Sequence, residues 1–519
     1  MSSTDPTPSP PRKPPRRRFS VDFEPLKERL QIRSWVERMR RDLSTGGFGL
    51  VVSLVVHGVL MVALGFILFS TRPVGDGDPL IASWLTPGEK AANQGRKIQA
   101  ISIPITAGPS TTTVPVNKTP SDVGEPNGAA RVGVSPVDVG QSLQTRNPRT
   151  RGASLERMGG TPDAERAIKQ GLLWLSRQQK TDGHWELHQG YPDAAFSTIR
   201  TDTGATSLSL LAFLGHGNTH QNGEFSDVVA KGLKWLQTTQ DPQTGDLHDL
   251  RQEEGRQGAF YAHAMGTIVL CEALALTQDD DLRPAAERAV KYLLSAQHPD
   301  NGGWKYRPIS KLMVGDLSVT GWALMALHTA RMAGIDIPHD DFVRASGFLD
   351  SVQVRGLPRY KYEPTTPDGK ASPAMTAEAL LCRQWLGWPK NFPEMVQGVK
   401  YITAAEQSPS WSGGRRNVYA WYYTSQMLHN IGGDDWKKWN TAVRDVIVRN
   451  QMTGGSVKAP MDVRGSWHPT VIPGDPFEHS EKGGRLYMTA LCILILETPY
   501  RHQPVYGTDE VAKANPTGE

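Results

Sequence analysis

Apolar helical segments alternate with turns that contain Gly and Pro from about Thr161 to residue 500, and the alternating pattern of strands is nearly absent. One phrase recurs along this stretch: an apolar helix end, then Gln, a Gly-containing turn and an aromatic residue. The clearest copies hold Gln179, Gly183 and Trp185, and Gln297, Gly303 and Trp304; weaker copies lie at Gln240–Gly245, Gln353–Tyr360, Gln407–Trp411 and Gln451–Gly454. Their spacing of about 45–60 residues is long enough for two helices and their turns.

A second phrase lies between these turns and consists of Thr followed by an Ala- and Leu-rich helix. Its six copies are centred on Thr206, Thr267, Thr320, Thr376, Thr424 and Thr489. Both patterns therefore predict six units, each with an outer helix, a Gly turn and an apolar inner helix. Because the inner helices need cover on two sides, we expect an all-α fold in which six helical hairpins close into an α/α toroid with a central cavity. An open α-solenoid is the alternative architecture.

The residues of the Gln/Gly/aromatic turn are interpreted as structural. Gly183 and Gly303 would permit a tight turn at the helix end, and Trp185 and Trp304 would fill apolar gaps. The amides of Gln179 and Gln297 would bond to backbone groups left open at helix ends. We expect these residues to fasten adjacent hairpins together.

The segment Gly171–Trp185 resembles the QW repeat of squalene and oxidosqualene cyclases, since it reads Gly-x-x-Trp-Leu-x-x-x-Gln-x-x-x-Gly-x-Trp. Related helical toroids occur in protein prenyltransferase β-subunits and in the thioester domains of complement-like proteins. The resemblance covers roughly residues 161–500. It implies the toroid fold of a divergent, membrane-anchored bacterial member and says little about chemistry.

The N-terminal third has a different composition. Gly46–Thr71 contains no Asp, Glu, Lys or Arg and is long enough to cross a membrane as a helix, and basic residues are concentrated before it. A cleaved signal peptide is the alternative. The expected organisation is a basic, mostly disordered cytoplasmic segment (1–45), a transmembrane helix (46–71), a disordered linker (72–160), an extracytoplasmic toroid (161–505) and a disordered tail (506–519).

The net charge of +4 gives no reason to expect nucleic acid as a partner. Cys271, Cys382 and Cys492 lie far apart in apolar runs, which indicates buried thiols and no disulfide framework. The expected partners are therefore the membrane and an isoprenoid lipid or a glycan.

The resemblance also identifies where chemistry would be expected. Class II terpene cyclases start from an Asp-x-Asp-Asp-Thr segment, and Asp316–Thr320 matches it in position, with Ser318 at the proton-donating residue and Val319 at the third Asp. The zinc site of prenyltransferases requires an Asp two residues before a Cys, where this chain has Val269, Leu380 and Ala490. The Gly-Cys-Gly-Glu-Gln segment of thioester domains is missing from the sequence too. We therefore expect no metal and no cofactor.

Ionisable residues recur four positions before the repeated Thr. In a closed ring these positions, which hold Asp202, His263, Asp316, Ser372, Ala420 and Arg485, would gather at one mouth of the cavity. Asp202, His263 and Asp316 are the candidate catalytic groups; alternatively, the two aspartates cap helices or face a helix dipole. Candidate ligand-binding residues are Trp322, Tyr306, Arg485 and Glu378, and Lys305, Trp421 and Tyr422 could also line the cavity.

Three functions remain open at this stage. The first is a non-catalytic binding or scaffold module, which the incomplete acid motif favours. The others are a divergent terpenoid cyclase-like enzyme acting on an isoprenoid lipid, and a polysaccharide lyase or hydrolase. A deep aromatic cavity would favour a lipid enzyme, an open polar groove would favour glycan chemistry, and a cavity filled by side chains would favour a scaffold.

Overall fold

The computed structural model describes residues 132–139, 142–189, 191, 197–248, 258–307, 314–454, 463–470 and 474–507. The predicted cytoplasmic segment (1–45) and membrane helix (46–71) lie outside these residues, as do most of the predicted linker and tail.

The described residues contain twelve helices that alternate between an outer and an inner layer, which gives six hairpins. The outer helices are α5 (Pro162–Gln178), α7 (Ser226–Thr239), α9 (Arg283–Ser295), α11 (His339–Val352), α13 (Pro393–Ile402) and α15 (Gly433–Arg449). The inner helices are α6 (Asp202–Gly215), α8 (Ala259–Thr277), α10 (Leu317–Met332), α12 (Pro373–Trp385), α14 (Val418–Ile431) and α16 (Ser480–Leu496). We number the hairpins 1 to 6 in chain order.

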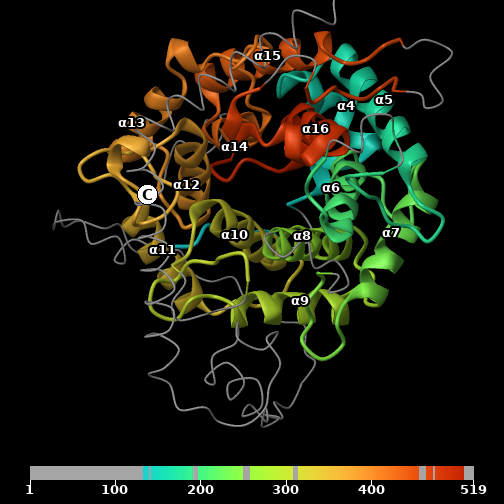
Figure 1. Ribbon diagram of the computed structural model, residues 1–519, viewed down its shortest axis with the longest axis horizontal. Helices are drawn as coiled ribbons and strands as arrows, with labels where there is room; N and C mark the ends of the chain where they lie inside the picture. The colour runs from blue at the N-terminus through green and yellow to red at the C-terminus, as the bar shows by residue number, and fades with distance from the viewer. Residues whose placement is uncertain are drawn as a thin grey trace, which may run out of the picture. The chain divides into compact units, whose positions relative to one another are not determined.

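The ring is closed. Each inner helix packs against the inner helices before and after it, and α16 of hairpin 6 packs against α6 of hairpin 1. In the outer layer, α15 contacts α5 across the same junction (Figure 1). The predicted all-α toroid of six hairpins is therefore confirmed, and the open solenoid is not what forms.

Inner helices are buried on every side because they lie between the outer layer and the ring centre. All residues of α6 are buried, whereas α5 keeps one face exposed to solvent. Among the described residues, α8 alone is long and apolar enough to cross a membrane. Within its most apolar stretch of 18 residues, 83% is buried inside the protein. It is a core helix of the toroid, so its hydropathy is explained without a membrane.

A bridging glutamine joins each of four hairpins to the next. Its side-chain amide donates one hydrogen bond to the turn of its own hairpin and another to the following outer helix. Gln179 bonds in this way to Gly183 and Val228, and Gln297 to Gly302 and Asp341. Gln240 repeats the pattern in hairpin 2. In hairpin 6, Gln451 bonds at 2.7 Å to the carbonyl of Ala167 in α5, so the same bridge closes the ring.

The two sequence repeats meet at the aromatic residue of the turn. The backbone N–H of Trp185 donates to the hydroxyl of Thr206 at 3.0 Å, and that of Trp304 donates to Thr320 at 3.0 Å. The pairs Tyr360–Thr376 and Trp467–Thr489 repeat this bond. Each indole is buried and donates to a carbonyl of its own outer helix, as Trp185 does to Leu175. The structural interpretation of the turn is consistent with these contacts.

Two details of the repeat differ from the sequence prediction. The left-handed residue of turn 3 is Gly302 (φ 74°), and Gly303 occupies the position of His184. In hairpin 6 the turn is formed by Gly465 and Trp467 and not by Gly454, because the chain makes a longer excursion after Gln451. A pattern search at fixed spacing misses such an insertion.

The folded part begins before residue 161, so the predicted linker extends too far. Residues 142–157 contain η2 (Gln144–Arg146) and α4 (Pro148–Arg157). Arg146 is fully buried and forms a bidentate pair with Glu272 of α8 at 2.8 and 2.9 Å. Arg501 of α17 (Thr498–Arg501) contacts the same carboxylate at 3.0 Å. Composition indicates a solvated linker here, but it does not reveal an arginine that complements a buried glutamate.

The close approach of Gly302 to α11 predicts a large stability loss for Gly302→Ala. An added Cβ would lie 1.9 Å from the carbonyl oxygen of Arg344, and the residue has a left-handed backbone. We expect a loss of at least about 2 kcal/mol in the free energy of unfolding. Chemical denaturation measures it. Gly347→Ala in α11 is the matched control, since nothing lies within 4 Å of its added Cβ, and it should be neutral or stabilising. Equal effects of the two substitutions would contradict this explanation.

Candidate functional site

The inner helices all begin at one end of the ring, which we call the N-terminal mouth. The hydroxyl groups of Tyr261 and Ser318 join the starts of α8 and α10 at 2.5 Å. The ring of Tyr419, at the start of α14, contacts the ring of His479 beside α16. Polar side chains from neighbouring hairpins therefore meet at this end.

The chain is extended where it passes the buried residue of each turn, which is Trp185, Leu247, Trp304 and Trp467 in hairpins 1, 2, 3 and 6, so a neighbouring side chain lies on the opposite side of the strand-like segment. This neighbour contacts the residue four positions before the repeated Thr. In hairpin 1 this level holds His184, Glu186 and Asp202. In hairpin 2 it holds Asp246 and His263, in hairpin 3 Lys305 and Asp316, and in hairpin 6 Ser466 and Arg485.

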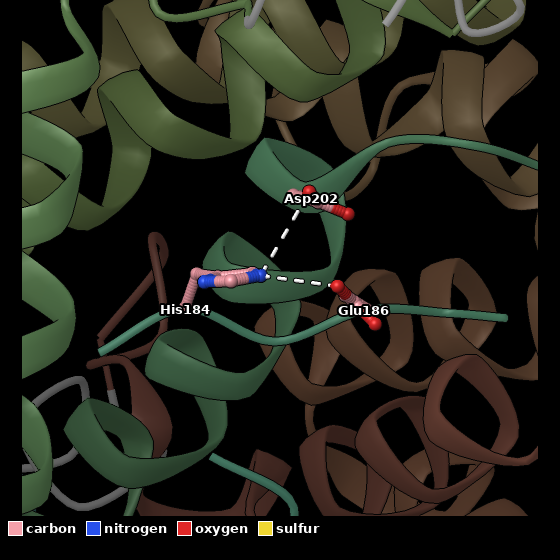
Figure 2. A group of neighbouring side chains, drawn as sticks. All are labelled: His184, Glu186 and Asp202. Carbon is pink, nitrogen blue, oxygen red and sulfur yellow. Dashed lines mark hydrogen bonds and ion pairs between the residues drawn. The ribbon is translucent and has the colours of Figure 1, made fainter. Parts of the chain in front are cut away.

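The three predicted catalytic residues are each engaged within their own region of the ring. Asp202 is the first residue of α6, and its carboxylate lies 3.8 Å from Nε2 of His184 (Figure 2). His263 is fully buried: its Nδ1 accepts a hydrogen bond from the backbone N–H of Leu247, and its Nε2 lies 3.0 Å from the carbonyl of Ala289 in α9. These contacts hold His263 against the outer layer.

Asp316 is the N-cap of α10, as the alternative interpretation expects. Its Oδ1 accepts hydrogen bonds from the backbone N–H of Val319 at 2.9 Å and from the hydroxyl of Ser318 at 2.8 Å. Its Oδ2 lies 3.2 Å from the ammonium group of Lys305. Burial raises the pKa of Asp316 despite that ion pair. The position that corresponds to the proton donor of cyclases is thus a serine held between Asp316 and Tyr261.

Glu378 is a buried carboxyl group in an aromatic setting. It lies on α12, accepts a hydrogen bond from the hydroxyl of Tyr419 at 3.0 Å, and packs against Gly321 of α10. Burial raises its pKa well above the usual value. Burial therefore favours the neutral form of this carboxyl group, and electrostatic coupling to Asp316 adds to this effect.

The remaining predicted residues occupy different places. The hydroxyl of Tyr306 bonds to that of Tyr362 at the N-terminal mouth, near Lys305. Arg485 is buried and donates to the hydroxyl of Ser466 at 2.9 Å. Trp322 lies in the centre of the ring, where it stacks on Tyr422 with 5.7 Å between the ring centroids.

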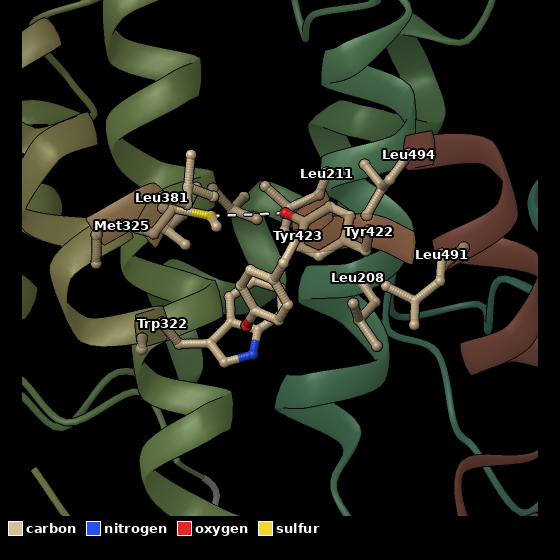
Figure 3. Packing of buried hydrophobic residues seen from close by; sticks show 14 of the residues in the cluster. Leu208, Leu211, Trp322, Met325, Leu381, Tyr422, Tyr423, Leu491 and Leu494 are labelled. Atoms are coloured by element: carbon tan, nitrogen blue, oxygen red, sulfur yellow. Dashed lines mark hydrogen bonds between the residues drawn. The ribbon is translucent and has the colours of Figure 1, made fainter. Parts of the chain in front are cut away.

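Side chains fill the ring centre beside Trp322. Aromatic and aliphatic groups from several inner helices meet there (Figure 3), including Leu208, Met325, Leu381, Tyr423 and Leu491, all of which are buried. The hydroxyl of Tyr422 lies 3.5 Å from the sulfur of Met325. This part of the ring centre is therefore filled by side chains.

Two pockets open at the ends of the ring. One of about 330 Å³ lies beside the starts of α12 and α14 and is lined by residues that include Ser372, Asn417, Trp421 and Arg415. The other, of about 390 Å³, lies at the opposite end and includes His328, His429 and His502. Burial lowers the pKa of His328 to about 3 and that of His429 to about 4, so these histidines are neutral.

Sequence reasoning did not identify Tyr261, Tyr362 or Tyr419, which complete the network around Asp316 and Glu378. Two of them, Tyr261 and Tyr419, precede the repeated Thr by six and five residues, which places them in the first turn of an inner helix. Their shared place in the first turn is a signal that could have pointed to the mouth. His184 and Glu186 were also missed, because the turn was interpreted as structural throughout.

The comparisons with known proteins agree with the fold. No family model matches the chain. A probable squalene–hopene cyclase of Sinorhizobium fredii is 28% identical over 223 residues, which cover 38% of this chain. The chain spans only 31% of the length of that protein. This similarity confirms the resemblance to the squalene cyclase superfamily inferred from the QW repeat.

Several solved structures are similar in outline. The α-1,6-mannanase of Salegentibacter sp. HEL1_6 is 10% identical with a TM-score of 0.43, over 66% of this chain and 99% of the mannanase. A cellobiose 2-epimerase of Bacillus thermoamylovorans is 12% identical with a TM-score of 0.45, over 64% and 98%. A type II terpene cyclase from Scytonema is 15% identical with a TM-score of 0.40, over 65% and 97%.

The raised pKa of Glu378 predicts the pH dependence of Glu378→Gln. Because the folded protein holds this proton more tightly than the unfolded chain, wild-type stability falls as the pH rises above the ordinary glutamate value of 4.5. The glutamine variant lacks this contribution. Its stability relative to wild type should therefore increase between pH 5 and pH 8, by at most about 1.4 kcal/mol per pH unit.

Urea denaturation at several pH values measures this trend. Glu363→Gln is the control, because the pKa of Glu363 is shifted in the opposite direction to that of Glu378. Burial raises the pKa of Glu363, but hydrogen bonds from Lys305 and Thr365 lower it below the usual value. The relative stability of that variant should not increase over the same range. A flat profile for Glu378→Gln would show that Glu378 is ionised in the folded protein.

Proposed function

We propose that this protein is a non-catalytic ligand-binding toroid, and that its N-terminal mouth binds a polyhydroxylated ligand of the glycan class. The observation that carries the proposal is the residue found at the position of the proton donor of cyclases. Ser318 stands there with its hydroxyl engaged by Tyr261 and Asp316, and the ring centre behind it is packed. A serine hydroxyl does not protonate an alkene, so cyclisation of an isoprenoid lacks its initiating group.

The chemistry of the mouth supports a hydroxyl-rich ligand. Tyr306, Tyr362 and Lys305 are half-buried, so they offer aromatic faces and a charged donor beside the carboxylate of Glu363. Binding sites with precisely placed polar groups next to aromatic surfaces suit ligands that carry many hydroxyl groups. The pocket at Trp421 and Arg415 adds the same combination at this end of the ring.

A second candidate function is glycoside chemistry at the same mouth. Asp316 is paired with a lysine ammonium, whereas Glu378 accepts a hydrogen bond from Tyr419, and burial raises the pKa of both carboxyl groups. Acid–base hydrolysis of glycosides uses a pair of carboxyl groups in different environments. The proposal also includes the location inferred from the sequence. Residues 46–71 would anchor the chain in a membrane, with the N-terminus in the cytoplasm and the toroid outside it.

An oligosaccharide array with the full-length chain tests binding, and Tyr306→Ala is the informative variant. We expect it to weaken binding to any positive oligosaccharide about tenfold, the loss typical of a contacting aromatic residue. Tyr401→Ala is the matched control, since Tyr401 is a half-buried tyrosine on the outer helix α13. Equal losses in both variants would contradict a site at the mouth.

Product analysis separates the functions. After incubation, mass spectrometry should find intact oligosaccharides and unreacted squalene. Shortened oligosaccharides that disappear with Glu378→Gln would establish the hydrolase instead. Cyclised squalene would overturn the proposal.

A further inference from the structure

We propose that His184, Glu186 and Asp202 form a binding site for a divalent transition-metal ion at the mouth of hairpin 1. The three residues come from two segments, the extended chain around Trp185 and the start of α6 (Figure 2). One ligand atom from each lies within 4.8 Å of the others. The sequence analysis expects no metal because the chain lacks the ligand pair of prenyltransferases, and it does not consider His184 or Glu186 as ligands.

The distances between the ligand atoms suit a shared ion. Nε2 of His184 lies 3.3 Å from Oε1 of Glu186 and 3.8 Å from Oδ2 of Asp202. Nitrogen and oxygen ligands bind zinc at about 2.0–2.2 Å, which places two adjacent ligands roughly 3.0–3.5 Å apart. The pair of His184 and Glu186 is already at such a distance, and Asp202 would have to move closer to complete the site.

The imidazole of His184 is held in the orientation that a metal ligand needs. Its Nδ1 lies 2.5 Å from the carboxylate of Asp182, and its ring stacks on Trp235 with 5.3 Å between the centroids. When Nδ1–H donates to Asp182, the lone pair of Nε2 points toward Glu186 and Asp202. A carboxylate that orients the distal nitrogen is the usual outer partner of a metal-bound histidine.

The local charge favours a cation. Asp182, Glu186 and Asp202 bring three carboxylates together around His184, and Lys180 contacts one of them, at 2.9 Å from Oε2 of Glu186. That contact leaves Oε1 facing His184. The three carboxylates outnumber this one ammonium group, so a dication would neutralise negative charge here.

Hairpins 3 and 6 supply a cation of their own at this level. In hairpin 3, Lys305 occupies the position of Glu186 and pairs directly with Asp316. In hairpin 6, Arg485 occupies the position of Asp202. Hairpin 2 has an Asp and a His, but His263 uses both ring nitrogens on backbone groups. Hairpin 1 instead combines an imidazole with two carboxylates, a mixed set that suits zinc or another first-row ion and leaves positions for water.

Zinc titration of the chelator-treated full-length chain by calorimetry tests the site, and cobalt replacement provides a visible spectrum from the bound ion. We expect one equivalent to bind. His184→Gln should weaken binding at least about 100-fold, and Asp182→Asn about 10- to 100-fold, because it removes the orienting partner. His220→Gln is the matched control: His220 pairs with Asp279 at 2.7 Å with similar exposure but without a third ligand, so binding should be unchanged.

Two results would overturn the inference. The first is no zinc binding up to about 0.1 mM, which would show that the cluster is only a hydrogen-bonded imidazole. The second is unchanged affinity and an unchanged cobalt spectrum in His184→Gln. If that variant does not fold, Glu186→Gln provides the same readout from the extended segment, where the side chain points away from the core. These outcomes do not depend on whether the mouth binds a glycan.

Discussion

The bridging glutamine is the contact on which the ring depends. Its amide satisfies a carbonyl of its own turn and one of the next outer helix, so it fixes the spacing between hairpins as well as the turn itself. Because Gln451 makes this contact to Ala167, the last hairpin meets the first through the same geometry that joins neighbours along the chain. A closed ring covers both faces of every inner helix, which an open array does not do at its ends.

The fold could be predicted from the sequence because the ring is repetitive. Two independent patterns, Gln/Gly/aromatic and Thr, gave the same number of units, and the structure shows why: the aromatic N–H donates to the Thr hydroxyl. The repeat pattern did not reveal insertions, or ion pairs between residues far apart in the sequence. The turn at Gly465 lies beyond an insertion, and Arg146 becomes ordered through Glu272, which is 126 residues away in the sequence.

The candidate site was harder to predict because register does not determine the direction of a side chain. Asp202, His263 and Asp316 each lie four residues before a repeated Thr. His263, however, contacts the carbonyl of Ala289 in α9, whereas Asp316 caps its own helix. Glu378 was predicted to line the cavity, but its raised pKa follows from burial and from electrostatic coupling to Asp316, which outweigh the hydrogen bond from Tyr419. Only the packed structure reveals these contacts. Ring closure thus sets which polar groups meet at the mouth.

The distance between α5 and the turn of hairpin 6 tests ring closure most directly. In the closed ring, Arg177 donates to the carbonyl of Arg464 at 3.0 Å although 287 residues separate them in the sequence. Spin labels on Arg177→Cys and Arg464→Cys, with the three native cysteines buried, would report this distance by double electron–electron resonance. A single short distance is expected. A long or broad distribution in a folded protein would show that the six hairpins form an open array.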